Sequence, residues 1–100
     1  MKYIYIEKYL LVPRDTKLEF FKFIGVFSKF KVIKQKVLLD DNSLVLELDK
    51  DSDMQLAQDS IAKFFKTDKN INVLIIENIF QSNKELVLEF KDNTKRKVRI

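Results

Sequence analysis

The sequence of 100 residues contains no cysteine and no histidine. Without cysteine the chain has no disulfide, no thiolate nucleophile and no cysteine-ligated zinc, which is typical of a protein from a reducing compartment. Without histidine it also lacks the usual general base near neutral pH and the commonest ligand of transition metals. The two absences exclude both standard catalytic triads. We therefore expect a protein that is not an enzyme and that carries no cofactor.

Glycine, proline and long apolar runs are also scarce. The chain has one glycine and one proline, which argues against a disordered linker. No apolar run approaches the roughly 18 residues that span a bilayer, and Glu7 and Lys8 interrupt the N-terminal apolar stretch, so we predict neither a membrane helix nor a signal peptide. Apolar residues make up 46% of the chain, enough for one core. We expect one soluble, cytoplasmic domain over residues 1–100.

Segments rich in β-branched and aromatic residues predict six strands. Several of them alternate apolar and polar residues, while residues 71–80 are apolar on both faces, as in a central strand. Two capping boxes, Thr16 with Glu19 and Ser52 with Gln55, predict helices that begin near Lys17 and Ser52. The predicted strands are residues 2–12, 31–39, 43–49, 71–80, 85–91 and 95–100. This order predicts an α+β fold: a ferredoxin-like βαββαβ sandwich with an additional C-terminal β-hairpin, in which two helices cover one face of an antiparallel sheet. The first four strands would lie in the order 4, 1, 3, 2, with the fifth beside the fourth.

The face without helices is the first candidate site. In the first strand Tyr3, Tyr5 and Tyr9 would point to this face, beside Leu74 and Ile76 of a central strand. Such an apolar patch favours burial against a protein partner or a second copy of the chain. Tyrosines in this position also stack bases in RNA-recognition modules. Two further alternatives are a terminal segment of the chain that folds over the face and an ordinary exposed face.

The excess positive charge lies in the last ten residues, where five basic residues against Asp92 give +4, the net charge of the whole chain. Such a strip could contact phosphates, and it could equally protect an edge strand from aggregation. The candidate nucleic-acid residues are Lys34, Lys36, Lys95, Arg96, Lys97 and Arg99.

The first predicted helix offers a smaller apolar patch away from its core stripe. Leu18, Phe21 and Gly25 lie on the otherwise polar side of that helix. Because glycine in a helix costs about 1 kcal/mol relative to alanine, a close approach of another backbone would explain its presence. Phe21 is therefore a candidate partner contact, and packing against the C-terminal hairpin is the alternative.

The predicted strand order, with its extra C-terminal strand, is similar to that of the small metal-dependent endonuclease of CRISPR adaptation. That family holds its metal ion with an aspartate at the end of the first strand. The equivalent stretch here begins at Glu7 and has no aspartate before Asp15. The resemblance implies Mg²⁺ or Mn²⁺ bound by Glu7 with Asp15 or another acid.

We predict from these patterns a small, non-enzymatic regulatory protein that acts by protein–protein contacts, as a homodimer or with another protein, through the tyrosine-bearing face. A nucleic-acid-binding module is the alternative, and the metal-dependent nuclease is a third hypothesis.

Overall fold

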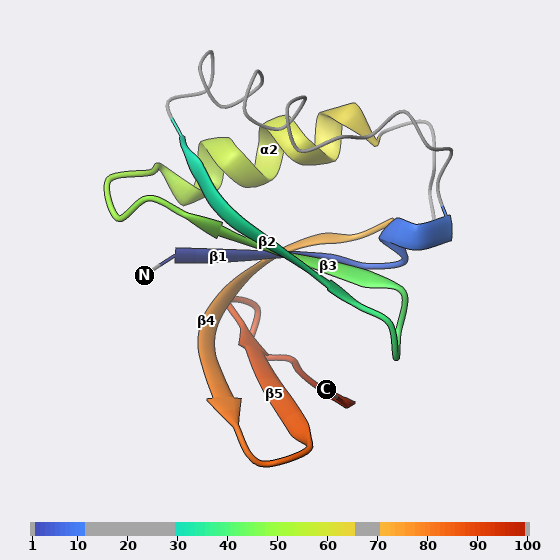
Figure 1. Cartoon of the computed structure of the whole chain (residues 1–100). Coiled ribbons are helices and arrows are strands. Elements are labelled where there is room, and N and C mark those ends of the chain that lie inside the picture. The colour runs from blue at the N-terminus through green and yellow to red at the C-terminus, as the bar shows by residue number, and fades with distance from the viewer. Residues whose placement is uncertain (1, 12–29, 66–70, 100) are drawn as a thin grey trace.

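In the computed structural model, residues 2–11, 30–65 and 71–99 are described, and they form one sheet, one short 3₁₀-helix and one α-helix (Figure 1). The elements in chain order are β1 (Lys2–Ile6), η1 (Tyr9–Leu11), β2 (Val32–Leu38), β3 (Ser43–Leu48), α2 (Met54–Phe64), β4 (Val73–Gln81), β5 (Glu85–Phe90) and β6 (Lys95–Arg99). All neighbouring strands are antiparallel, in the order β2-β3-β1-β4-β5-β6. Within these residues no helix is long and apolar enough to cross a membrane.

The ferredoxin-like sandwich with two helices is wrong as a description of this fold. The described part is mostly antiparallel sheet with a single α-helix, and the other predicted helix, with Phe21, lies outside the described residues. The predicted neighbours in the sheet do agree with the observed order. The prediction failed because it assumed two layers, whereas the sheet folds over and supplies a third.

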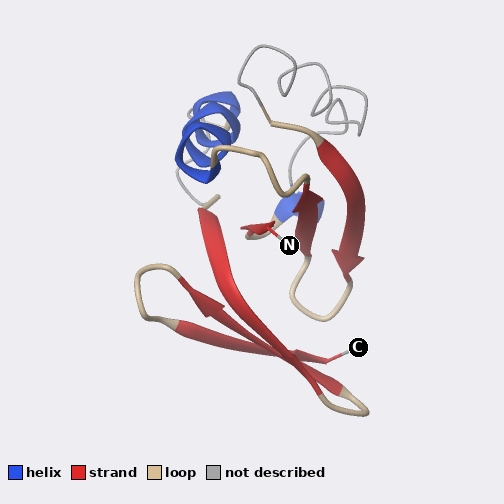
Figure 2. Ribbon diagram, turned by 90° about the vertical axis from the view of Figure 1, so that its left-hand side faces the viewer, coloured by secondary structure: helices blue, strands red, loops and turns tan. Residues whose placement is uncertain are grey.

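A bend in β4 produces that third layer. Residues up to Ile76 pair with β1, and residues from Ile76 onward pair with β5 after a register shift at Glu77. A bulge of this kind bends a strand and increases its twist. We call β2, β3 and β1 the N-terminal leaf, and the part of β4 after the bulge with β5 and β6 the C-terminal leaf. Figure 2 shows the C-terminal leaf below the N-terminal leaf, on the side away from α2.

Two hydrophobic clusters hold the three layers together. The helix-side cluster joins one face of the N-terminal leaf to α2, where Ala57 and Ile61 are fully buried. The second cluster joins the other face to the C-terminal leaf, and its buried residues are Tyr5, Leu38, Val45, Ile76, Leu86, Leu88, Phe90 and Val98. Both faces of β1 and β3 are therefore covered, whereas residues 33–37 of β2 stay exposed. Of the alternatives for the tyrosine-bearing face, the one observed is a terminal segment that folds over it.

Local contacts explain where several elements begin and end. The first strand stops at Ile6 because Lys8 adopts a left-handed conformation (φ 58°), and its carbonyl oxygen then accepts a hydrogen bond from the N–H of Leu11. The N-cap of α2 is Asp53, whose carboxylate accepts from the N–H of Leu56 at 3.1 Å. The prediction of Ser52 as the cap was wrong by one residue, because Ser52 is buried and its hydroxyl accepts from a backbone N–H elsewhere.

Candidate functional site

The sequence-predicted partner face lies inside the molecule. Tyr5 is 0% exposed and Ile76 is 5% exposed, and both belong to the second hydrophobic cluster. Leu74 is partly buried and packs against this cluster. Tyr3 is half-buried at the margin of this cluster. Tyr9 lies in η1 and packs against the helix-side cluster instead. The expected row of three tyrosines on an uncovered face is therefore wrong, although four of the five residues do lie together.

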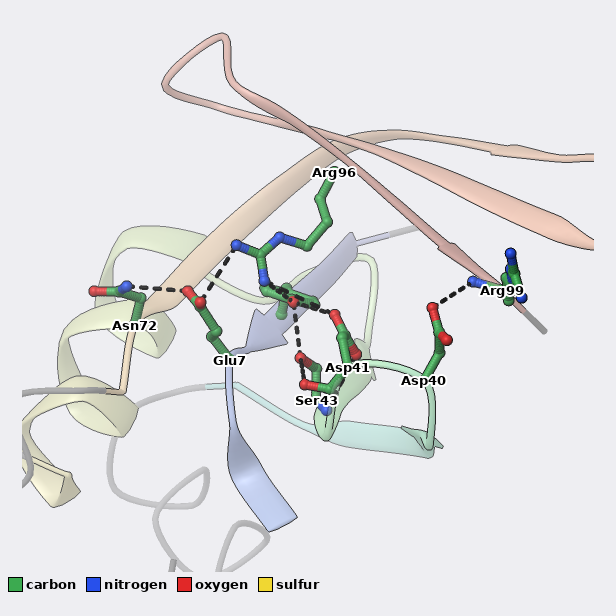
Figure 3. Close-up of polar contacts among 8 residues, drawn as sticks. Glu7, Asp40, Asp41, Ser43, Asn72, Arg96 and Arg99 are labelled. Carbon is green, nitrogen blue, oxygen red and sulfur yellow. Dashed lines mark hydrogen bonds and ion pairs between the residues drawn. The ribbon is translucent and has the colours of Figure 1, made fainter. Parts of the chain in front are cut away.

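The hydroxyl of Tyr5 is the centre of a polar network that joins the two leaves (Figure 3). It donates a hydrogen bond to the carboxylate of Asp41 and accepts one from Ser43 Oγ at 2.7 Å and one from Arg96 Nη1 at 2.9 Å. Burial, together with the hydrogen bond to Asp41, raises the pKa of Tyr5 from 10.0 to about 12. The hydroxyl therefore stays protonated above the pH at which tyrosine ordinarily ionises, and its hydrogen bonds join residues of both leaves.

Arg96 completes this network from β6. Its Nη2 lies 3.3 Å from a carboxylate oxygen of Glu7, its Nη1 lies 3.9 Å from Asp41, and the guanidinium carbon lies 5.5 Å from the centre of the Tyr5 ring. Burial by itself would raise the pKa of Glu7, but the hydrogen bond from Asn72 and the charge of Arg96 outweigh it and lower that pKa below its ordinary 4.5. Arg96 is thus held by acids of its own chain.

Two further candidate cations have acidic partners on β5. Lys95 Nζ lies 3.1 Å from Glu89, and Lys97 Nζ lies 3.6 Å from Glu85, on the outer face of the C-terminal leaf. Arg99 lies at the end of β6, where its backbone N–H donates to Asp40 at 3.1 Å. The basic C-terminal strand is therefore largely balanced by neighbouring carboxylates. This weakens the argument for a phosphate-binding strip along β6.

A metal site of the nuclease type finds no support in the described part. No group of three acidic side chains close enough to hold a metal ion occurs among those residues. The Glu7 carboxylate accepts a hydrogen bond from Asn72 Nδ2 at 3.0 Å and pairs with Arg96. Asp15 lies outside the described residues.

The surface that stands out is the edge strand β2 with the turn that follows it. Six large apolar side chains of the described part are exposed, and three of them, Ile33, Val37 and Leu39, lie within seven residues of each other. Within the described part β2 has a neighbouring strand on one side only. Lys34 and Lys36 are exposed on the same strand, and neither makes an ion pair with a described residue.

An open groove of about 530 Å³ runs between the leaves beside β2. Its apolar lining comes from both leaves and includes Val45, Ile79, Leu86 and Leu88. Its polar lining includes Lys34, Lys36, Glu47, Gln81 and Tyr3, whose hydroxyl donates to Glu47 at 3.4 Å. A second hollow of about 490 Å³ extends from Lys36 past Leu39 to Arg99. The two hollows share Lys36, so they form one surface along β2.

We call this surface the β2 edge surface, formed by Ile33, Lys34, Lys36, Val37, Leu39 and Arg99. The sequence analysis selected its three cations for nucleic acid but missed its three apolar residues. A signal for them was present, since the segment 32–39 places apolar side chains on both faces of a single strand. Such a strand has more apolar residues than one covered face requires.

A comparison with protein-family models finds no match, and comparisons with curated protein sequences and with solved structures find none either.

Proposed function

We propose that this chain is a small non-enzymatic protein that acts by binding another protein, and that the partner adds a strand to the edge of β2. The observation that carries the proposal is the concentration of exposed apolar side chains, Ile33, Val37 and Leu39, on and beside an edge strand. The lack of cysteine, which is typical of reducing compartments, supports a cytoplasmic site of action.

Strand addition suits this surface for a physical reason. The outer edge of a strand presents backbone N–H and C=O groups that a second extended chain can satisfy. A strand beside β2 would contact side chains on both faces at once, because alternate residues point to opposite sides. It would cover Val37 on the helix side, and on the other side it would close the mouth of the groove.

The tyrosine-bearing face is not part of this proposal. Covering Tyr5 and Ile76 with a partner would require the C-terminal leaf to leave, which would expose the second hydrophobic cluster and break the network at Arg96. A second copy of the chain remains a competing occupant of the β2 edge surface itself.

Single-stranded nucleic acid is a second candidate for the same surface, because Lys34 and Lys36 make no ion pair within the described part. Two or three phosphate contacts to a single strand would weaken binding by roughly 7- to 20-fold between 50 and 200 mM salt. Fluorescence anisotropy with labelled oligonucleotides over that range tests this candidate. A partner bound mainly through apolar side chains would show little salt dependence.

Site-specific photo-crosslinking tests the proposal in cells of the source organism. A benzophenone amino acid at position 39, where Leu39 is 79% exposed, should crosslink to one protein, and Val37→Asp should abolish the product. The same probe in place of Leu56, an exposed leucine of α2, is the matched control. A product of equal yield at both positions, or none at position 39, would contradict the proposal. The mass of the product distinguishes another protein from a second copy.

A further inference from the structure

We infer that the strand received by β2 is acidic, with carboxylates two residues apart that face Lys34 and Lys36. This inference rests on the proposed strand addition and names the chemistry of the partner. It follows from the faces on which the side chains of β2 lie, from the charges around them and from the groove beside them.

The register of β2 places both lysines on the groove side. Lys34 lies opposite Glu47 and Lys36 opposite Val45, a residue of the second hydrophobic cluster. Gln35 and Val37 lie opposite Leu46 and Leu44, which belong to the helix-side cluster. A strand added to β2 keeps this alternation, so two of its side chains, about 7 Å apart, must lie next to the lysines.

Neither lysine makes an ion pair with a described residue, although Glu47 lies opposite Lys34 across the strand pair. The carboxylate of Glu47 instead accepts a hydrogen bond from the hydroxyl of Tyr3. At the far end of the β2 edge surface, the hollow beside Lys36 is lined by Arg99 and by Asp40. The carboxylate of Asp40 accepts from the backbone N–H of Arg99 and makes no ion pair with Lys36. Carboxylates of a partner could pair with Lys34 and Lys36, whereas a cationic strand would place like charges beside them.

The same lysines disfavour a second copy of β2. Like charges placed directly opposite each other across a strand pair are destabilising, and lysines on edge strands are a common protection against self-pairing. In an antiparallel pair of β2 strands centred on Gln35, Lys34 of each copy would lie opposite Lys36 of the other. That register is disfavoured for two copies of β2 and is favourable for an acidic strand.

The groove favours glutamate over aspartate at these positions. Its apolar lining from Ile79, Leu86 and Leu88 lies next to the lysines. The longer aliphatic stem of glutamate can cover that lining while its carboxylate stays at the polar rim. On the helix side, the intervening residues of the partner would face Gln35 and Val37. The expected pattern is acid, polar, acid, apolar along the partner strand, in one direction or the other.

Three fluorescein-labelled peptides that differ at the two acidic positions test the inference. Their central segments are Glu-Thr-Glu-Val, Gln-Thr-Gln-Val and Lys-Thr-Lys-Val, and the readout is fluorescence anisotropy with the full chain. We expect the glutamate peptide to bind about tenfold more tightly than the glutamine peptide, and the lysine peptide more weakly still. In the Lys34→Glu, Lys36→Glu double variant, the preference should invert in favour of the lysine peptide. A Lys50→Glu, Lys63→Glu variant, changed at exposed lysines outside this surface, should keep the original preference.

The outcomes separate the inference from the proposed function. If the glutamate and glutamine peptides bind equally well and both compete with the product crosslinked at Leu39, the acidic partner is refuted while strand addition stands. If none of the three peptides binds, the acidic partner is refuted. If the probe at position 39 then also gives no product, strand addition fails with it.

Discussion

Replacing Tyr5 by phenylalanine removes one hydroxyl from the network between the leaves and leaves the ring in place. The ring stays packed in the second hydrophobic cluster, with its centre 5.2 Å from that of Phe90. The lost hydroxyl makes three hydrogen bonds, to Ser43, Asp41 and Arg96. A neutral hydrogen bond contributes about 1 kcal/mol, and one to a charged group about 1.5–3 kcal/mol.

Because Asp41 and Arg96 stay partly exposed and close to each other, we take the lower end and discount it for solvent. The Tyr5→Phe variant should lose about 2–3 kcal/mol of unfolding free energy, a large share of the roughly 5–15 kcal/mol of a typical domain. Urea denaturation followed by circular dichroism measures this loss.

Tyr3→Phe is the control for the same chemical change. Tyr3 is a half-buried residue and its hydrogen bond to Glu47 is long, at 3.4 Å, so the loss of that bond should cost less than about 1 kcal/mol. Equal losses in the two variants, or a loss below about 0.5 kcal/mol for Tyr5→Phe, would refute the role assigned to the network.

Three further predictions concern stability. Asp53→Ala should cost about 1 kcal/mol of unfolding free energy by removing the cap of α2, while Asp51→Ala, at an exposed residue outside the helix, should cost much less in the same urea assay. Folding raises the pKa of Tyr5 from 10.0 to about 12, so the contribution of its protonated hydroxyl to the unfolding free energy is complete below pH 10 and falls as the pH rises toward about 12. Absorbance at alkaline pH should show a late tyrosinate component that the Tyr5→Phe variant lacks. Folding lowers the pKa of Glu7 below 4.5, so the contribution of its carboxylate to the unfolding free energy is present above pH 4.5 and is lost as the pH falls through the pKa of the folded state. The Glu7→Gln variant should therefore be less sensitive to acid, which urea midpoints at neutral and acidic pH measure.

The strands were predictable because their side chains alternate with period two. The segment 43–49 shows this most clearly, since Leu44, Leu46 and Leu48 all lie in the helix-side cluster, as alternation requires. The turns at Asn42 and Asn93 also follow from composition, because asparagine tolerates the left-handed conformation that both residues adopt.

The third layer could not be derived from alternation alone. It depends on the bulge at Glu77, and nothing in the residues of β4 marks where the register shifts. The left-handed conformation of Lys8 could not be derived from alternation either. It ends β1 early and places Tyr9 in η1, away from the other tyrosines. The apolar face of β1 and β4 was correctly seen to need a cover, but local patterns do not show whether the cover belongs to the same chain.

The candidate site was only partly predictable for a related reason. Lys34 and Lys36 could be selected from charge, but Lys95 and Lys97 looked equivalent to them in the sequence. In the folded sheet Glu89 and Glu85 form ion pairs with the C-terminal lysines. Glu47 lies opposite Lys34 but accepts a hydrogen bond from Tyr3, so the lysines of β2 have no ion pair among the described residues. Pairing of this kind depends on register, which only the folded sheet defines.

Amide hydrogen exchange with a bound acidic peptide tests the central claim most directly. The full chain is exchanged alone and at saturation with the Glu-Thr-Glu-Val peptide, and protection is read by mass spectrometry or NMR. Strand addition predicts new protection in residues 33–38, because outward-facing amides of β2 would donate to the peptide backbone, with little change in α2. Protection that appears along β6 or α2 while β2 exchanges as before would contradict it.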